Sequence, residues 1–393
     1  MNRSPDFLLS AGEASGDNYG AQLIAALRQL APGAAFFGMG GEKMQAAGCE
    51  LKVHAKDVAV VGLVEVLTHL PAIRKHFKHL VAEAARRKPD AAVLIDFPDF
   101  NLRLARELHR LGIPVFYFVS PQLWAWRTGR VKQIKKYVRK IIVIFPFEQE
   151  FYARHGVEAV YVGHPLAHAP APQITRAEFA ARFQLDAAKQ WIALLPGSRR
   201  KEVELNLPLM LQAADLLRKQ GKGYEFILPL ASTLAEDWMR QQLAASSVVV
   251  KLTRDARATM THARASVVAS GTATVEAALS GTPFVVVYRL APLTWLLGRR
   301  LVRLDTFAMA NLIAGKKIVP ELIQRDFTPE TVLAELATIL PEGPARQRMQ
   351  ADLAQVKERL LHAEGAEPPA VQAAAQVLSG IAGPVKVVEK QLF

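Results

Sequence analysis

The sequence is poor in the features that mark specialised classes of protein. Its 393 residues include a single cysteine, Cys49, which has no partner for an intrachain disulfide. No window reaches the roughly 18 uninterrupted apolar residues of a membrane-spanning helix. Near the N-terminus only residues 7–9 form an apolar run, far short of the core of a signal peptide. These absences exclude a disulfide scaffold and predict a cytoplasmic protein.

Several nucleotide-binding and metal-binding motifs are also missing. The sequence has no Walker A motif with its lysine and no G-x-G-x-x-G after the first predicted strand. It has no cluster of Cys and His residues and no D-x-D pair for a divalent cation. A P-loop kinase, a simple dehydrogenase and a structural zinc protein are therefore disfavoured.

Acidic residues are fewer than basic ones. There are 36 Asp and Glu against 49 Lys and Arg, which gives a formal net charge of +13. Such a protein attracts polyanions, whether nucleic acid, anionic lipid or phosphorylated substrates, and the charge alone does not choose among them. Because no nucleic-acid-binding module is recognisable and acids stand in three of the predicted strand-end loops, we expect no nucleic-acid partner.

Short apolar runs alternate with helical patterns along most of the chain. Runs rich in Val, Ile and Phe cover 7–9, 91–95, 115–119, 141–145 and 159–162, and then 191–195, 226–229, 248–252, 266–269 and 283–288. Between such runs, apolar residues recur at helical spacing, as at 23, 26, 27 and 30. Strands that are buried on both faces belong to parallel sheets, so this alternation predicts an α/β fold with two doubly wound domains.

The predicted domain boundary follows from a break in this alternation. Residues 168–175 contain two prolines and no apolar period, which is typical of a linker. From residue 329 onward the chain is mostly helical and rich in alanine. We therefore expect domains at 1–170 and 171–345, followed by C-terminal helices at 346–393.

Two loops of the first predicted domain carry acids where ligands bind in such folds, beyond the carboxyl ends of the strands. One is the glycine-rich loop with Glu13, which suits a polar contact to a hydroxyl or amide. Its alternative is a turn in which Asp17 caps the following helix. The other loop begins with Asp96, whose partly desolvated carboxylate would be a usable general base. We favour Asp96 over Asp99, because Asp99 lies just before a helix that it can cap.

Two loops of the second predicted domain suit an anion. The first, 194–199, leads from a strand through a Gly-Ser turn to fixed cations and includes Ser198 and Arg199. The alternative there is that Ser198 caps a helix that begins with a solvated charged run. The second loop opens a helix, whose N–H groups favour a diphosphate, and Glu276 could reach a ribose diol. Its diphosphate-facing residues would be Ser270, Gly271 and Thr272.

An amphipathic stretch with basic neighbours lies at 58–80. It suggests contact with an anionic membrane surface, although core packing explains Phe77 and Leu80 better, and Pro71 should break or kink the helix. A second apolar and basic segment lies at 295–303, and Trp124, Trp126 and Arg127 could pack a sugar or acyl chain. The membrane-facing residues would be Leu63, Val64, Val66, Leu67 and Leu70.

Taken together, the motifs resemble the lipid-A-disaccharide synthases of Gram-negative bacteria. The resemblance runs in order from about residue 7 to about residue 325 and includes SGEASGD, IDFPDFN, YFVSPQLWAWR, PFEQEFY, VGHP, LLPGSRRKEVE, SGTATVE and NLIAGKKIVPELIQ. One departure is Ala308-Met-Ala before Asn311, where the family is expected to have a proline. The C-terminal part matches only in its helical character.

This resemblance implies a GT-B glycosyltransferase, with two Rossmann-like domains facing a cleft, C-terminal helices that pack back on the first domain, and no metal or cofactor. Such enzymes transfer 2,3-diacylglucosamine from UDP-2,3-diacylglucosamine to 2,3-diacylglucosamine 1-phosphate with inversion, and release UDP. Asp96 matches the family's proposed base. The family's activity or UDP-binding positions fall on Glu13, Arg199, Glu276 and Asn311, and its diphosphate loop on Ser270, Gly271 and Thr272.

The resemblance further implies an enzyme that associates peripherally with the inner membrane. It implies a monomer or a homodimer, with C-terminal helices that in this family can exchange between the two subunits of a dimer. The alternative function is another UDP-sugar enzyme of the same fold, either similar to UDP-N-acetylglucosamine 2-epimerase or acting on a soluble acceptor. A soluble acceptor would need no lipid-facing surface, so the stretch 58–80 favours the lipid substrate.

Overall fold

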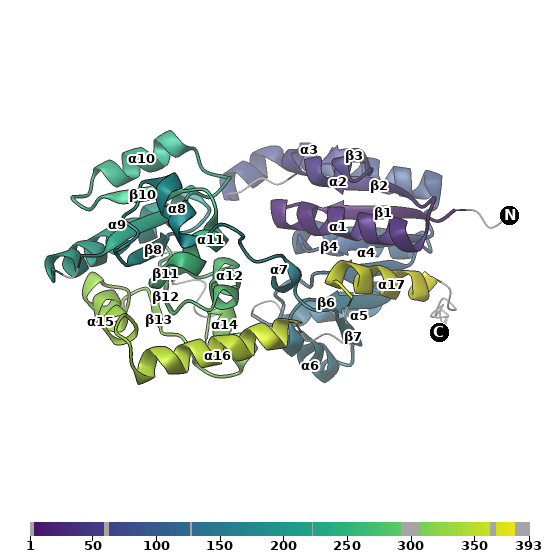
Figure 1. Ribbon diagram of the computed structural model, residues 1–393. Helices are drawn as coiled ribbons and strands as arrows, with labels where there is room; N and C mark the ends of the chain where they lie inside the picture. The colour runs from purple at the N-terminus through teal and green to yellow at the C-terminus, as the bar shows by residue number, and fades with distance from the viewer. Residues whose placement is uncertain are drawn as a thin grey trace. The chain divides into compact units, whose positions relative to one another are not determined.

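The computed structural model describes residues 4–58, 63–125, 128–221, 223–291, 306–361 and 367–381, with the backbone alone at 63–69. The chain forms two compact units (Figure 1). The first unit contains Met1–His168 together with Leu360–Phe393, and the second contains Ala169–Arg359. Of the predicted C-terminal segment, residues up to Arg359 thus belong to the second unit and those from Leu360 to the first.

The first unit is built on a parallel sheet. Its described residues form seven strands in the order β3-β2-β1-β4-β5-β6-β7. The strands are β1 (Asp6–Ala11), β2 (Ala35–Gly40), β3 (Glu50–His54), β4 (Ala91–Ile95), β5 (Val115–Phe118), β6 (Lys140–Val143) and β7 (Ala159–Tyr161).

Helices cover both faces of this sheet, because successive strand residues point to opposite sides and both sides are apolar. Phe7 and Leu9 pack with α1 and α17, whereas Leu8 packs with α3 and α4. The helices are α1 (Ala14–Leu30), α2 (Glu42–Ala46), α3 (Leu63–Arg87), α4 (Pro98–Arg110), α5 (Val131–Tyr137), α6 (Pro146–Arg154), α7 (Pro165–His168) and α17 (Pro369–Ile381), with short 3₁₀ turns η1 (Ala55–Asp57) and η2 (Thr128–Arg130).

The last described helix returns to the first unit, as predicted. Figure 1 shows α17, at the yellow end of the colour scale, beside the purple α1. Ala373, Ala374 and Val377 are fully buried in the same apolar cluster as Phe7. A Cβ at Gly380 would lie 2.5 Å from the Phe116 ring, so the absence of a side chain allows this close packing.

The second unit repeats the doubly wound pattern. Six parallel strands among its described residues have the order β10-β9-β8-β11-β12-β13. They are β8 (Trp191–Leu195), β9 (Glu225–Pro229), β10 (Val250–Thr253), β11 (Ala265–Ala269), β12 (Phe284–Tyr288) and β13 (Glu321–Ile323). The helices are α8 (Arg176–Phe183), α9 (Arg200–Lys219), α10 (Glu236–Ala244), α11 (Ala256–His262), α12 (Ala273–Ser280), α14 (Met309–Ala314), α15 (Pro329–Ile339) and α16 (Pro344–Leu361).

The predicted α/β class is confirmed, and the differences are local. Strands β2, β3 and β13 were not predicted: β2 contains two glycines, β3 is a partly polar edge strand, and β13 has only three residues. Of the break or kink predicted at Pro71, the break is wrong, because α3 continues through this residue. A proline removes one backbone hydrogen bond from a helix, and a helix of 25 residues anchored in the core by Leu80 and Ala84 tolerates that loss.

Candidate active site

Asp96 lies directly after β4, at the carboxyl edge of the first sheet. In the neighbouring strands Ala11 pairs with Ile95, and Ile95 pairs with Phe118, so the ends of β1, β4 and β5 lie side by side. The loop with Glu13 follows β1, and Asp96 therefore lies beside it. Of all the predicted site residues of the first unit, the structure thus brings Glu13 and Asp96 to one place.

Burial changes the chemistry of the Asp96 carboxyl group. Desolvation first, and the negative charge of Glu13 second, raise the pKa of Asp96 to about 7. A carboxylate with such a pKa is a better proton acceptor at neutral pH than an ordinary aspartate. Asp99, in contrast, is 68% exposed and forms an ion pair with Arg130. Asp99 lies inside the first turn of α4, whose N-cap is Phe97, so the expected capping of this helix by Asp99 is wrong.

The backbone around Asp96 is strained. Asp96 and Phe97 have φ angles of +44° and +51°, and Val119, at the end of the neighbouring β5, has a φ of +59°. Residues other than glycine rarely adopt this left-handed conformation, and each such residue costs about 1–3 kcal/mol of conformational free energy. Three such residues on adjacent strand ends concentrate strain around the candidate base.

Glu13 and the glycines of its loop have separate structural roles. Glu13 is exposed at the N-cap position of α1 and its side chain makes no capping hydrogen bond. A Cβ at Gly12 would lie 2.3 Å from the Phe97 ring, so only glycine fits beside the residue that follows Asp96. Asp17 lies inside α1 and caps α2 instead, accepting hydrogen bonds from Gly41 N–H (2.7 Å) and Met44 N–H (3.0 Å). The expected capping of α1 by Asp17 is therefore wrong.

A second buried carboxyl group, which the sequence reasoning missed, lies beyond β6. Glu148 is 1% exposed, and burial raises its pKa to about 8. It accepts hydrogen bonds from Phe145 N–H (3.2 Å) and from the indole N–H of Trp124 (3.3 Å). The sequence offered two signals for it: its place in the first turn of a helix that follows a strand, and its place in the motif PFEQEFY. Trp126 and Arg127, predicted at the same rim, lie outside the described residues.

His164 follows β7 and packs inside the first unit. Its ring is 1% exposed and lies 5.0 Å from the Phe145 ring, centroid to centroid. Burial lowers the pKa of His164 to about 3, so it stays neutral and accepts a hydrogen bond from Leu166 N–H (3.2 Å).

In the second unit, the side chain of Glu202 already binds backbone N–H groups of the loop after β8. The Glu202 carboxylate accepts hydrogen bonds from the N–H groups of Ser198 (3.1 Å) and Arg199 (3.3 Å). Arg199 is 60% exposed, and its guanidinium lies 3.5 Å from the same carboxylate. The N-cap of α9 is Arg199 and not Ser198, so the alternative reading of Ser198 as the cap is wrong. An anion on these N–H groups has to compete with Glu202.

The loop after β11 is open. Gly271 has a φ of +148° with empty space around its missing side chain, and Thr272 is the N-cap of α12. Among the described residues, the N–H groups of Gly271 and Thr272 have no hydrogen-bond acceptor. Two hydrogen bonds fix Ser270: its N–H donates to Val287 O (2.9 Å) and its hydroxyl donates to Phe307 O (3.2 Å). Exposed, unpaired N–H groups at the start of a helix form a site for an anion.

The two loops are neighbours because their strands are. Leu195 of β8 pairs with Val268 of β11, which places the loops that follow these strands at the same edge of the second sheet. Glu276 lies partly buried in α12, where burial raises its pKa while the charge of Arg257 lowers it. The edge therefore combines N–H donors, the Arg199 guanidinium and an acid.

The Asn311 side chain is buried and bonded within the second unit. It is 1% exposed, and its oxygen accepts hydrogen bonds from Ile318 N–H (2.7 Å) and Val319 N–H (2.9 Å). Its amide donates to Val319 O (3.0 Å) and to the Glu321 carboxylate (2.6 Å). All four hydrogen-bonding positions of the amide are thus filled. Glu321 also accepts from Phe307 N–H (2.8 Å), which connects Asn311 to the residue that holds Ser270.

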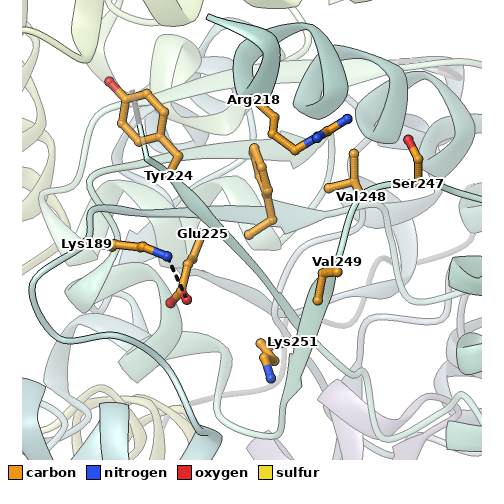
Figure 2. Close-up of a pocket in the computed structure, with 9 residues that line it drawn as sticks. Lys189, Arg218, Tyr224, Glu225, Ser247, Val248, Val249 and Lys251 are labelled. Atoms are coloured by element: carbon orange, nitrogen blue, oxygen red, sulfur yellow. Dashed lines mark ion pairs between the residues drawn. The ribbon is translucent and has the colours of Figure 1, made fainter. Parts of the chain in front are cut away.

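Other features of the described residues lie apart from these loops. A depression of about 280 Å³ lies at the amino ends of β9 and β10, and Lys189 and Glu225 form an ion pair of 3.8 Å beside it. Figure 2 shows the side chains that line it. It contains none of the predicted site residues; the predicted anion loops of the second unit follow β8 and β11 at the opposite edge of the sheet. Nowhere in the described ranges do three His, Cys, Asp or Glu side chains gather in a way that could hold a metal ion.

The predicted membrane-facing stretch is only partly visible. Leu80 is fully buried and Phe77 packs against the same apolar cluster, so the core role predicted for both is confirmed. Leu70 is half-buried, while the side chains of Leu63, Val64, Val66 and Leu67 and the segment 295–303 lie outside the described residues. No helix in the described part of the chain has the length and apolar character needed to cross a bilayer.

Comparisons with known proteins agree with this geometry. The sequence model of the lipid-A-disaccharide synthetase family matches residues 7–377. A curated lipid-A-disaccharide synthase from Koribacter versatilis is 56% identical over 375 residues, which cover 95% of this chain and 97% of that protein.

Solved structures share the fold at low identity. The glycotransferase of kitacinnamycin aligns with a TM-score of 0.64 at 16% identity, covering 96% of this chain and 99% of that one. The UDP-GlcNAc 2-epimerase from Neisseria meningitidis bound to UDP-GlcNAc aligns with a TM-score of 0.59 at 11% identity, covering 95% of this chain and 98% of that one. These likenesses show the GT-B fold alone, whereas the family match and the closely similar relative extend over nearly the whole sequence. The chain therefore belongs to the lipid-A-disaccharide synthase family of glycosyltransferases.

Proposed function

We propose that the protein transfers 2,3-diacylglucosamine from UDP-2,3-diacylglucosamine to the 6-hydroxyl of 2,3-diacylglucosamine 1-phosphate by a single inverting displacement. The observation that carries the mechanism is the partly buried Asp96 carboxyl, with its pKa raised to about 7, in a chain 56% identical to a lipid-A-disaccharide synthase. The acceptor oxygen forms a bond to the anomeric carbon as Asp96 takes its proton. The bond from that carbon to the diphosphate breaks, and its electrons leave with UDP.

The second unit would hold the donor. The N–H groups of Gly271 and Thr272, which have no acceptor among the described residues, suit together with Arg199 the diphosphate on which negative charge develops as the bond breaks. Glu276 suits the ribose hydroxyls. In this proposal Asn311 acts through Glu321 and Phe307, which keep the Ser270 loop in place, rather than by touching the nucleotide.

The first unit would then take the acceptor and meet the membrane. Glu13 would act by keeping the pKa of Asp96 high. The sequence 63–70, rich in apolar residues and followed by Arg74, Lys75 and Lys78, supports peripheral contact with an anionic lipid surface. Flotation with phosphatidylglycerol vesicles tests this contact: we expect Leu63→Ser and Leu67→Ser together to reduce binding, and undiminished binding would reject this surface.

The reaction is tested with purified protein, both lipid substrates, detergent and EDTA. UDP release together with a product of disaccharide 1-phosphate mass would support the donor, the acceptor and the lack of a metal requirement. UDP binding without disaccharide would reject the acceptor.

The role of Asp96 is tested by Asp96→Asn, since asparagine tolerates the left-handed backbone of this position. We expect UDP affinity to stay normal while turnover falls by about 10²- to 10⁴-fold, the usual contribution of a general base. Near-normal turnover would remove Asp96 from the role.

A further inference from the structure

The backbone of Asp96 is fastened by two buried side chains that the proposed mechanism does not use. Asn101, in the first turn of α4, is fully buried, and so is Tyr117 on β5. Both donate hydrogen bonds to the carbonyl oxygen of Asp96, from the Asn101 amide at 2.8 Å and from the Tyr117 hydroxyl at 2.6 Å. One carbonyl oxygen thus uses both of its lone pairs on side chains from two other elements.

Asn101 connects this carbonyl to the neighbouring strand end. Its amide also lies 3.1 Å from Ile95 O and 3.2 Å from Ser10 O, and its oxygen accepts from the Ser10 hydroxyl at 2.6 Å. Ser10 belongs to β1, directly before the loop that contains Glu13. The single amide therefore fixes the end of β1 relative to the end of β4.

Tyr117 connects the same carbonyl to β5. Burial raises the pKa of Tyr117 well above its ordinary value, so the phenol keeps its proton and remains a donor. On the other side of the peptide, Asp96 N–H lies 3.2 Å from Val119 O. Asp96 is thus bonded through its carbonyl to the two buried side chains and through its N–H to the left-handed residue Val119 of the neighbouring strand end.

We infer that Asn101 and Tyr117 are positioning residues for Asp96, which hold its backbone in the left-handed conformation that sets the direction of its carboxylate. The inference rests on the proposed role of Asp96 as the base. Without these two hydrogen bonds the strain of the left-handed conformation is less well offset, and the residue relaxes toward the extended conformation that a strand end ordinarily adopts. Such a shift moves the carboxylate relative to the acceptor hydroxyl, and a misplacement of about 1 Å can slow a reaction by about 10²-fold.

Tyr117→Phe tests the inference because it removes one hydroxyl and keeps the ring. We expect kcat to fall by about tenfold to 10²-fold, with the KM for both substrates and the UDP affinity unchanged. The acid limb of the pH profile should also move, toward the ordinary carboxyl range, since a displaced carboxyl is less completely desolvated.

Tyr152→Phe is the matched control. Tyr152 is also a fully buried tyrosine of the first unit, and its hydroxyl bonds to the Ser120 hydroxyl (2.7 Å) instead of Asp96. If the two variants lose equal thermal stability but only Tyr117→Phe loses kcat and shifts the pH limb, the positioning role is supported. An unchanged kcat, or a loss of kcat with the pH limb in its original place, would overturn it.

The double variant separates this inference from the proposed function. In an Asp96→Asn background, Tyr117→Phe should cause no further loss, because the group that it positions is already absent. Additive losses would show that Tyr117 acts elsewhere and would overturn the inference. If Asp96→Asn alone has near-normal turnover, it is the proposed base that fails.

Discussion

The raised pKa of Asp96 makes a quantitative prediction about the pH dependence of turnover. If Asp96 accepts the proton, only its ionised form is active. With a pKa of about 7, half of the molecules are competent at pH 7, about one in eleven at pH 6 and about 1% at pH 5. An ordinary aspartate would remain almost fully ionised over this range. We therefore expect kcat/KM, measured as UDP release, to fall nearly tenfold per pH unit below pH 6.5.

Glu13→Gln identifies the group that titrates. Because the negative charge of Glu13 raises the pKa of Asp96, its removal should lower that pKa and move the acid limb to lower pH, whatever happens to the maximal rate. The phosphate of the acceptor also titrates near pH 6, but Glu13→Gln would not shift a substrate pKa.

Asp99→Asn is the control for this shift, since Asp99 is exposed and paired with Arg130. It should leave the acid limb in place. A wild-type limb near pH 4, or a limb that Glu13→Gln does not move, would refute the assignment of Asp96 as a desolvated base.

Two further predictions concern UDP binding in the second unit. Arg199→Ala should weaken UDP binding by about tenfold in calorimetry, as expected for the loss of a charged hydrogen bond. The control is Arg218→Ala, which removes a similar ion pair at the far end of α9 and should leave the UDP affinity unchanged. Equal UDP affinities of the two variants would contradict the diphosphate assignment. Glu202→Gln should tighten UDP binding by a few fold, because the neutral amide competes less well for the N–H groups of Ser198 and Arg199, with exposed Glu204→Gln as the control. Weaker binding by Glu202→Gln would instead show that the carboxylate supports the bound state.

The sequence was sufficient to predict the layout but not the smaller pieces of it. Apolar runs identified β1, β4, β5, β8 and β11, whose strand ends carry the candidate site. Edge strands were missed because they do not need an apolar residue at every position. In β3, for example, most residues are partly or fully exposed. The position of each loop at a strand end followed from the fold class, so Asp96, Arg199 and Ser270 could be selected without coordinates.

What the sequence could not show is how each side chain is bonded. The residue types at 96 and 97 do not by themselves predict a left-handed backbone. The hydrogen bonds that stabilise it come from Asn101 and from Tyr117 on the neighbouring strand. Similarly, Glu202 looked like one member of a solvated charged run, yet it fills the N–H groups of the preceding turn. Asn311 is saturated by bonds to its own loop and to Glu321, which no spacing pattern reveals.

The raised pKa of Asp96 also has a cost to the fold, and the direction of its pH dependence can be worked out. Between its unfolded value of 3.8 and its folded value of about 7, the folded protein holds a proton that the unfolded chain has lost, so stability falls as pH rises through this window. Integrated from pH 5 to pH 8, the loss is about 3 kcal/mol for this group. Asp96→Asn carries no charge at either pH and should escape this loss. Denaturation of both proteins at the two pH values measures the difference, and an equal pH dependence would mean that the carboxyl is not desolvated. A residue that only stabilised the fold would not need to be a buried acid in a strained backbone. If Asp96 is catalytic, we expect Asp96→Asn to be more stable than the wild type at pH 8 and to have lower turnover.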